Sequence, residues 1–416
     1  MNQKQETLRK GLLGLSRTIV ILGVVSLLTD LSTEMLVPMI PLFLQNILKA
    51  TGTDIGIIEG FAESIASLLR IYAGWLADRF GRPKLLAVLG YGLSSAAKPF
   101  LALATAWPHV FAVRVADRFG KGIRSAPRDV IIAESAPQEV RGRAFGFHRA
   151  MDTTGAVLGP LAALIIIPYF LRRSERSAFE AVFLIAAVPA LAAVVVLAAL
   201  VPEKRKEARP LAPPRINWSA LSPPLKRFLL VVAIFSIGNS SDAFLILRAG
   251  DVIMRAHGFG TTVEQVLVIY ILFNAVSAVV TLPAGITSDR VGRAPVVLAG
   301  LLVFAATYLG FALAATPAAA WTLFAIYGIY YGLTAGVLRA FAADLAPPEV
   351  RGTLIGAYFT IESLCLLPAS IIAGLLWDHV GHSAPFYYGA AAALLAALLL
   401  LTLVRSGEHR ITSRRR

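Results

Sequence analysis

The chain has 416 residues, of which 57% are hydrophobic and only 15% are charged. A soluble protein carries about a quarter charged residues, so this composition excludes a water-soluble globular protein. The net charge of +14 does not indicate a nucleic-acid partner, because the basic residues cluster in loops and tails, where they orient the chain and meet anionic lipid.

Apolar runs of roughly 20 residues repeat along the chain, which is the length of a helix that spans a bilayer. The alternating pattern of transmembrane barrel strands is absent. Residues 202–226 combine charges with prolines and predict a linker between an N-terminal bundle (1–201) and a C-terminal bundle (227–416) with a basic tail. The predicted spans are 18–46, 55–77, 85–105, 108–134, 144–168, 178–201, 227–249, 262–287, 295–316, 319–344, 353–377 and 384–404.

Lysine and arginine residues in short loops predict the orientation, because they collect on the cytoplasmic side of a membrane. The N-terminus, the loops at 79–84 and 141–143, the linker and the C-terminal tail all carry them. We therefore expect a multi-pass protein of a prokaryotic-type plasma (inner) membrane, with both termini in the cytoplasm. The loop at 171–180 is also basic and opposes this trend.

Two short sequences occur once in each half of the chain. The sequence Asp78–Arg82 returns in similar form as Asp289–Arg293, and Ala136–Gly142 returns as Ala346–Gly352. Parallel repeats of six spans, related by an axis along the membrane normal, are typical of transporters. The predicted fold is an all-α polytopic membrane protein with twelve transmembrane helices in two six-helix bundles related by pseudo-two-fold symmetry.

The first of these loops resembles the most specific motif of the major facilitator superfamily of secondary transporters, and the resemblance covers essentially the whole chain. The motif reads Gly-x-Leu-Ala-Asp-Arg-x-Gly-Arg-Lys; residues 74–82 match it, and Lys84 is displaced one place by Pro83. The resemblance implies that this loop closes a cytoplasmic gate by pairing with charges on neighbouring helices. With the second copy, the implied gate residues are Gly74, Asp78, Arg79, Gly81, Arg82, Asp289, Arg290, Gly292 and Arg293.

The fourth and fifth predicted spans carry two further motifs of that superfamily. Arg118 and Gly122 are similar to its Arg-x3-Gly motif, whose arginine is associated with proton coupling. The fifth span is similar to the antiporter motif Gly-x8-Gly-x3-Gly-Pro, although the closing pair of glycines is missing. The other interpretation is an ordinary close contact between helices, which glycines also permit. The antiporter-motif positions are Gly146, Gly155, Gly159 and Pro160.

Several ionisable side chains fall at membrane depth, where they are costly and usually functional. Asp30 and Glu34 are four residues apart and share a helix face. A carboxylate in a cleft can bind a proton from one side of the membrane and release it on the other. Side chains near span ends, such as Glu59, can instead extend to the interface. The predicted substrate or proton-coupling residues are Asp30, Glu34, Glu59, Glu63, Arg114, Arg118, Lys121, His148 and Asp152.

The sequence predicts a secondary transporter without enzyme activity. It contains no phosphate-binding loop, paired zinc motif or nucleophile elbow, so we expect no cofactor and no resident metal ion. Carboxylates in the N-terminal half would favour a cationic substrate or a proton, whereas the basic residues of the fourth predicted span would favour an anionic group. The sequence therefore does not decide the charge or the identity of the substrate.

The leading interpretation is proton-coupled efflux of a small organic molecule by alternating access. One alternative is a proton-coupled importer of a metal chelate, sugar or organic anion. The alternative of another class is a non-transporting membrane receptor or a lipid-processing enzyme. The expected partners are a small-molecule substrate, protons and membrane lipid, with no nucleic acid, and we expect a monomer.

Overall fold

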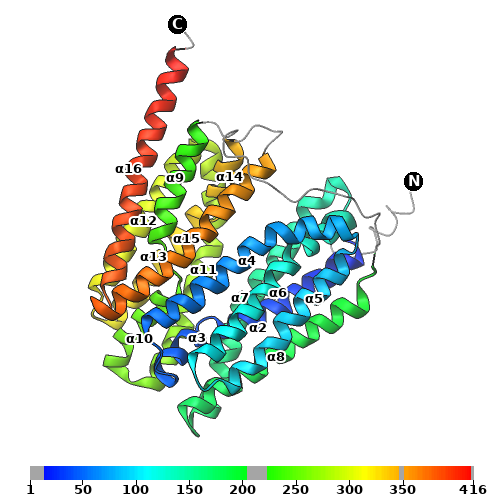
Figure 1. Cartoon of the computed structure of the whole chain (residues 1–416), viewed down its shortest axis with the longest axis vertical. Helices are drawn as coiled ribbons and strands as arrows, with labels where there is room; N and C mark the ends of the chain where they lie inside the picture. Colours follow the sequence, from blue (N-terminus) through cyan, green and yellow to red (C-terminus); the bar gives the residue numbers. More distant parts are fainter. Residues whose placement is uncertain (1–13, 204–222, 346–350, 414–416) are drawn as a thin grey trace. The chain divides into compact units, whose positions relative to one another are not determined.

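A computed structural model describes residues 14–203, 223–345 and 351–413 (Figure 1). Within these ranges, side chains are described except at 71, 74, 78, 224, 351–356 and 403–413. The described residues form helices joined by short turns, and no strand occurs among them. The all-α prediction is therefore confirmed.

The helices of the first half begin where the sequence supplies a starting signal. Prolines occupy the first turn of the helices that start at Pro83 and Trp107, where their missing N–H is not needed. Ser174, which precedes α8, and Ser177 in its first turn form a reciprocal capping box. In order, the elements are α2 (Arg17–Leu36), α3 (Met39–Leu42), the π-helix η2 (Phe43–Ile47), α4 (Gly52–Phe80), α5 (Pro83–Ala97), the 3₁₀ helix η3 (Lys98–Leu103), α6 (Trp107–Ser135), the 3₁₀ helix η4 (Gln138–Val140), α7 (Arg141–Leu171) and α8 (Glu175–Leu200).

Glycines in the left-handed backbone region separate successive helices of the second half. Gly258 has φ +78° and Gly292 has φ +93°, a conformation that other residues resist. The elements are α9 (Pro223–Gly238), α10 (Ala243–His257), α11 (Phe259–Val291), α12 (Arg293–Leu313), α13 (Pro317–Thr334), α14 (Val337–Asp344), α15 (Arg351–His379) and α16 (Ala384–Ser413).

Ten stretches of the described residues are helical, long and apolar enough to cross a membrane. Helices α4 and α6 have 29 residues each but include several charged side chains, and they are not among the ten. The polytopic membrane fold is confirmed, whereas the count of twelve spans stays a prediction. Three predicted spans are interrupted, one after Leu36, one between Gly238 and Ala243, and one between Thr334 and Val337.

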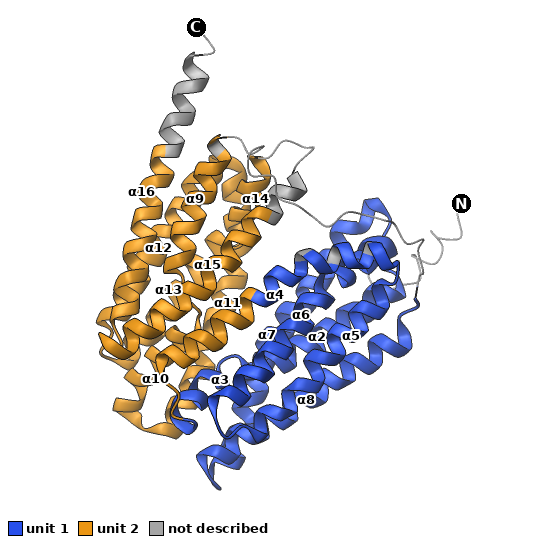
Figure 2. Ribbon diagram, viewed as in Figure 1, with its two compact units in different colours: residues 1–48, 65–214 blue, residues 49–64, 215–416 orange. Residues whose placement is uncertain are grey.

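The chain forms two compact units (Figure 2). Unit 1 contains residues 1–48 and 65–214, and unit 2 contains residues 49–64 and 215–416. Helix α4 therefore contributes its first part to unit 2 and its remainder to unit 1. The bundle boundaries and the pseudo-two-fold symmetry that the sequence suggests stay predictions.

Residues 52–64 join unit 2 through small residues that allow close packing against α15. A β-carbon added to Gly56 would lie 2.1 Å from the carbonyl oxygen of Ser370, and one added to Gly374 would lie 2.4 Å from that of Gly52. The Asp378 carboxylate also accepts hydrogen bonds from the backbone N–H groups of Gly52 and Thr53, both at 2.8 Å. These bonds satisfy donors at the start of α4 that have no partner within the helix.

Buried aromatic side chains form much of the core of unit 2. The rings of Phe304 and Tyr308 stack with centroids 3.9 Å apart, and Phe386 contacts Tyr308 edge-on at 5.5 Å. Edge-to-face and offset arrangements of this kind stabilise a core beyond the area that they bury. The core of unit 1 is mainly aliphatic by contrast, and α2 packs there against α7 and α8.

Candidate functional site

Helices α2 and α7 approach each other closely at two glycines of the predicted antiporter motif. A β-carbon added to Gly155 would lie 3.0 Å from the Asp30 β-carbon, and one added to Gly159 would lie 2.9 Å from that of Glu34. These glycines therefore bring both acidic positions of α2 against α7. Pro160 is buried in α7 beside them. Gly146 differs, because a β-carbon there would meet nothing within 4 Å.

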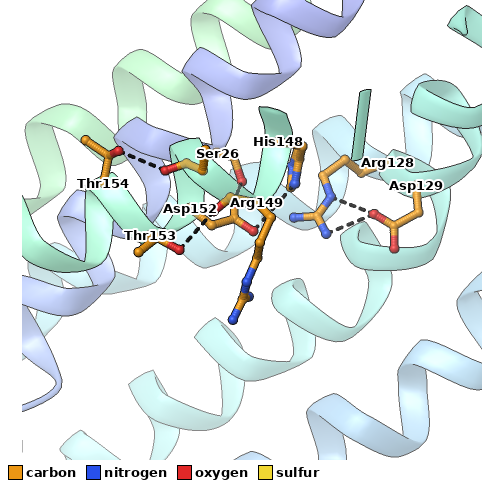
Figure 3. A network of polar contacts seen from close by, with 9 residues as sticks. Ser26, Arg128, Asp129, His148, Arg149, Asp152, Thr153 and Thr154 are labelled. Carbon is orange, nitrogen blue, oxygen red and sulfur yellow. Dashed lines mark hydrogen bonds and ion pairs between the residues drawn. The ribbon is translucent and has the colours of Figure 1, made fainter. Parts of the chain in front are cut away.

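A polar network links the same two helices (Figure 3). The Ser26 hydroxyl of α2 donates a hydrogen bond to the carboxylate of Asp152 in α7. His148 lies one turn before Asp152, with Nδ1 3.5 Å from the carboxylate. The His148 side chain is buried, and its Nε2 has no hydrogen-bond partner among the described residues. The network thus holds two groups that can exchange protons, a carboxylate and an imidazole.

An ion pair within α6 is drawn in the same view (Figure 3). The Arg128 guanidinium donates to one carboxylate oxygen of Asp129, from Nε at 3.0 Å and from Nη2 at 2.9 Å. The Thr153 and Thr154 hydroxyls bond to carbonyls one turn earlier in α7. Both threonine hydroxyls therefore form hydrogen bonds within α7. The polar contacts described for Asp152 are those with Ser26 and His148.

Lys98, the first residue of η3, is a buried cation that is 1% exposed. Its Nζ donates to the hydroxyls of Ser32 and Thr33 in α2, at 2.8 and 3.0 Å. A buried ammonium group requires hydrogen-bond partners or a counter-charge. The hydroxyls of α2 supply the hydrogen bonds, and they hold the cation two residues from the Asp30 position along the helix.

Asp117 of α6 supplies a negative charge in this part of unit 1. It lies 4.0 Å from both Arg114 and Arg118, and it accepts a hydrogen bond from the Ser94 hydroxyl of α5. All four residues are buried. A small cavity lined by Lys98, Arg114 and Asp117, among others, lies next to them. Buried charges of both signs are therefore paired or hydrogen-bonded here, as ionisable groups inside membrane proteins usually are.

The sequence profile of the Major Facilitator Superfamily matches residues 22–367 and 252–416. The chain belongs to the Major Facilitator Superfamily. It is therefore a transporter and not an enzyme, which confirms both the resemblance seen in the sequence and the coarse prediction of secondary transport.

This transporter is similar to proteins from distant organisms. An uncharacterized MFS-type transporter of Methanocaldococcus jannaschii is 36% identical over 376 residues, which are 90% of this chain and 92% of the relative. A probable 4-methylmuconolactone transporter of Cupriavidus pinatubonensis is 23% identical over 80% of this chain and 77% of its own length. A POT peptide transporter solved in complex with sulfate shares the fold, with a TM-score of 0.79 and 14% identity over 98% of this chain and 99% of its own.

The structure of this superfamily member brings together only some of the predicted coupling residues. Asp30, Glu34, His148 and Asp152 all lie at the contact of α2 and α7. Arg114 and Arg118 gather around Asp117, and the half-buried Lys121 lies one turn further along α6. Glu59, which is buried, and Glu63, which is half-buried, belong instead to unit 2.

The predicted motif glycine Gly122 serves helix packing in unit 1. A β-carbon there would lie 2.7 Å from the Leu69 β-carbon of α4. Gly90 and Gly120 make a similar contact between α5 and α6, where added β-carbons would lie 2.6 and 2.5 Å from the opposing carbonyl oxygens. Small residues let helices approach closely in membranes, so these glycines set the positions of the α6 charges.

The first predicted gate loop follows α4. Gly81 has φ +62° and thereby ends the helix, and the Arg79 guanidinium lies 5.1 Å from the Trp75 ring centroid. Arg82 is exposed. The other two predicted gate positions of this copy, Gly74 and Asp78, lie in α4, and their surroundings are outside the described part of the structure.

The second gate loop joins α11 to α12. Arg293 Nη1 lies 2.5 Å from Asp289, and its Nε lies 3.0 Å from Asp344 of α14. Gly292 supplies the positive φ of the turn, and Arg290 is exposed. These described ion pairs fall within unit 2, and a gate that pairs charges of both halves stays a prediction. The second copy of the other repeat, 346–352, lies outside the residues whose side chains are described.

Sequence reasoning missed Lys98. The prediction treated residues 85–105 as an apolar span and gave its one internal lysine no role. A lone cation inside an apolar span was itself the signal, because such residues are rare there and face the protein interior. The hydroxyls that bind it come from α2, more than sixty residues earlier, so the partners were not readable from local sequence.

Proposed function

We propose that this transporter exports a small organic molecule in exchange for protons, by alternating access. The observation that carries the proposal is the link from Ser26 to Asp152 and on to His148, at a contact of two membrane helices. Carboxylate and histidine side chains inside membrane proteins commonly form proton relays. Here Asp152 and His148 lie at the same contact of α2 and α7 as Asp30. Proton transfer and the binding of a charged substrate would therefore involve the same two helices.

In this proposal the acidic residues of α2 and α7 carry the protons and the α6 cluster balances charge. Asp30, Glu34 and Asp152 bind and release protons, and His148 passes a proton to or from Asp152. Lys98, Arg114 and Arg118 compensate the charge of carboxylates that have lost a proton. The export direction is supported by the similarity of Gly146, Gly155, Gly159 and Pro160 to the antiporter motif.

The test uses everted membrane vesicles with a pH gradient and a fluorescent dye that the gradient quenches. Addition of a transported compound to wild-type vesicles is expected to restore fluorescence, because exchange consumes protons. Asp152→Asn and Asp30→Asn are expected to abolish the response. Glu175→Gln is the matched control, because Glu175 is exposed at the start of α8, and it should respond like wild type. Full responses from both asparagine variants would remove these carboxylates from the mechanism.

Import of a small organic acid is the second candidate. The substrate class of this candidate is supported by the relative named a probable 4-methylmuconolactone transporter and by the buried cations Lys98, Arg114 and Arg118. Right-side-out vesicles separate the two directions. Uptake of a labelled organic acid driven by an inward proton gradient would support import, and uptake abolished by that gradient would support export.

We further propose that both termini face the cytoplasm of a plasma (inner) membrane, that the transporter acts as a monomer, and that the loops ending at Arg82 and Arg293 close its cytoplasmic side. The distribution of lysine and arginine supports the topology. Protease digestion of terminal tags in intact and everted vesicles tests it, and tags cut only in everted vesicles are the expected result.

A further inference from the structure

One membrane-crossing stretch of unit 2 is broken at its middle. Residues Leu225–His257 form one of the ten candidate spans, but α9 ends at Gly238 and α10 begins at Ala243. Backbone that is not helical is tolerated at membrane depth only where protein or water satisfies its polar groups. Interrupted helices of this kind often carry the substrate or ion sites of transporters, so the side chains at the break are candidates for such a role.

Serine hydroxyls satisfy backbone N–H groups at this break. The Ser241 N–H donates to the Ser370 hydroxyl of α15 at 3.1 Å, and the Ala243 N–H donates to the Ser241 hydroxyl at 3.3 Å. Asp242 occupies the N-cap position of α10, where an aspartate usually accepts a hydrogen bond from the first turn. Its side chain makes no such cap, so the carboxylate is directed elsewhere.

The Asp242 carboxylate accepts a hydrogen bond from a buried tyrosine. The Tyr327 hydroxyl of α13 donates to Asp242 Oδ1 at 2.7 Å. The Tyr327 ring is 2% exposed and stacks on Phe273 of α11 with centroids 5.4 Å apart, which fixes the position of its hydroxyl. Asp242 itself is half-buried. The carboxylate therefore has a fixed donor on one side and keeps accessible surface through which a proton can arrive.

The titratable groups that face Asp242 from α12 and α13 are tyrosines, which are uncharged at neutral pH. Tyr308, Tyr327 and Tyr330 are buried and lie close enough to interact with its charge. On its own helix, Arg248 donates to carbonyl groups at the end of α12. A charged carboxylate among aromatic rings costs free energy that a bound proton removes, and such residues in membrane spans often carry protons.

Helix α15 and the first part of α4 add acidic residues to this region of unit 2. A β-carbon added to Gly60 of α4 would lie 2.9 Å from the β-carbon of Ser370, the residue that bonds to the break. Glu59 directly precedes Gly60, and Glu63 follows it by three residues. Glu362 lies about two turns before Ser370 in α15. Two of the predicted coupling residues therefore belong to helices that meet beside the broken span.

The internal repeat relates Asp242 to Asp30. The two repeated sequences recur after 211 residues (289 − 78) and 210 residues (346 − 136), and Asp242 follows Asp30 by 212 (242 − 30). Both acids lie in the first predicted span of their half. The packing corresponds as well, because α2 packs on α7 and α9 packs on α15, and these partners contain the fifth predicted span of each half. Asp242 therefore occupies nearly the position in unit 2 that Asp30 has in unit 1.

We propose that Asp242 is a second proton-binding carboxylate of this transporter, the counterpart in unit 2 of Asp30. Tyr327 is its positioning residue, whose hydroxyl donates to the carboxylate once the proton has left. Each transport cycle adds one proton to a carboxylate oxygen and removes it again, so no other reactant is required. The inference rests on the proposed function, and it assigns proton coupling to both units instead of unit 1 alone.

Infrared spectroscopy of the purified full-length protein detects the bound proton, because a protonated carboxyl group has a carbonyl stretching band that a carboxylate lacks. Difference spectra between about pH 6 and pH 9 exclude exposed acidic side chains, which titrate near about pH 4. The wild type is expected to show a band that Asp242→Asn lacks. Asparagine keeps an acceptor for Tyr327 and caps helices as well as aspartate does, so this variant should unfold at the wild-type temperature. Identical difference spectra would overturn the proposal.

Two further variants test the carboxyl group and its positioning contact. Asp242→Glu keeps a carboxyl group, so the band should shift in frequency and not disappear. Tyr327→Phe keeps the stacked ring and removes the hydroxyl, which should shift the pH midpoint of the band, since a hydrogen bond changes the protonation equilibrium of a carboxylate. Tyr387→Phe, at an exposed tyrosine of the same unit, is the matched control and should leave the midpoint unchanged. An unshifted midpoint in Tyr327→Phe would overturn the assigned contact.

The vesicle assay tests whether this proton is coupled to transport. With a compound that restores fluorescence in wild-type vesicles, Asp242→Asn is expected to abolish the response and Asp242→Glu to retain part of it. Glu264→Gln is the matched control, because Glu264 is a half-buried acid near the start of α11, and it should respond like wild type. A full response from Asp242→Asn would overturn the coupling role.

The two measurements separate failure of this inference from failure of the proposed function. A band lost in Asp242→Asn, with no proton-linked flux in the wild type, would keep the proton site and remove the proton-coupled exporter. Proton-linked flux that persists undiminished in Asp242→Asn would keep the exporter and remove Asp242 from its mechanism.

Discussion

A β-carbon added to Gly155 of α7 would lie 2.7 Å from the carbonyl oxygen of Leu27 in α2. Real β-carbons do not approach an atom that closely, and a backbone oxygen cannot move aside as the end of a side chain can. The spacing of the two helices, and with it the position of Asp30 against α7, therefore depends on glycine at this position.

We expect Gly155→Ala to lower the free energy of unfolding by about 1–3 kcal/mol, because the methyl group overpacks the contact. Gly146→Ala is the matched control in the same helix. Nothing lies within 4 Å of a β-carbon there, so it should be neutral or stabilise by up to about 1 kcal/mol. Thermal unfolding of both variants in detergent measures the difference, and equal stabilities would contradict the close contact.

A second prediction concerns Arg248, which is buried in α10 and supports the end of α12. Its Nε donates to the carbonyl of Phe311 at 3.0 Å, and its Nη2 donates to that of Ala314 at 2.9 Å. We expect Arg248→Gln to destabilise unit 2 by about 2–4 kcal/mol, since hydrogen bonds to a charged group are among the stronger ones and the carbonyls lose their donor. Denaturant unfolding measures the change.

The matched control for Arg248 is Arg255→Gln on the same helix. Arg255 is exposed, so its substitution should change the free energy of unfolding by no more than about 0.5 kcal/mol. A loss at Arg255 as large as that at Arg248 would show that the positive charge of α10, and not the bonds to α12, stabilises the unit.

The sequence predicted the long helices well because apolar length is a local property. The predicted span 144–168 lies inside α7 (Arg141–Leu171), and 262–287 lies inside α11 (Phe259–Val291). Both helices extend beyond the apolar run, since polar residues at the ends continue the backbone hydrogen bonding. The break between Gly238 and Ala243 was not predicted, because its Asn-Ser-Ser-Asp sequence contains no proline.

The site was only partly predictable because its contacts join distant helices. Helical spacing showed that Asp30 and Glu34 share a face, but not that Gly155 and Gly159 would press α7 against it. The basic loop at 171–180 was likewise unexplained by charge counting. In the structure most of that predicted loop is helical, because α8 begins at Glu175. Arg176, in the first turn of α8, donates to Glu180 at 2.6 Å and to the carbonyl of Ala104 at 2.8 Å, which gives one of these arginines a packing role.

A third prediction concerns the start of α4. Asp378 accepts hydrogen bonds from the N–H groups of Gly52 and Thr53 and from the Thr53 hydroxyl at 2.6 Å. Asp378→Ala should cost about 1–2 kcal/mol, as the loss of a capping side chain usually does. His379→Ala, at the next and also exposed residue, should cost no more than about 0.5 kcal/mol. Thermal unfolding compares the two, and equal losses would contradict the capping role.

The fourth prediction separates a functional from a structural role for Lys98. Lys98→Met removes the buried charge at similar volume, and such replacements are often neutral or stabilising. The Ser32 and Thr33 hydroxyls can turn to carbonyls of their own helix. We therefore expect stability within about 1.5 kcal/mol of wild type, measured by thermal unfolding. Transport should fall at least about tenfold in the vesicle assay, because the α2 carboxylates lose a nearby positive charge.

The matched control for Lys98 is Lys226→Met, because Lys226 is exposed at the start of α9 and should leave both transport and stability unchanged. Wild-type transport by Lys98→Met would show that the lysine only packs α2 against η3. A large loss of stability together with transport would assign the same structural role. Retained stability with lost transport is the one outcome that ties the buried cation to the movement of charge, since packing alone does not distinguish a lysine from a methionine of similar volume.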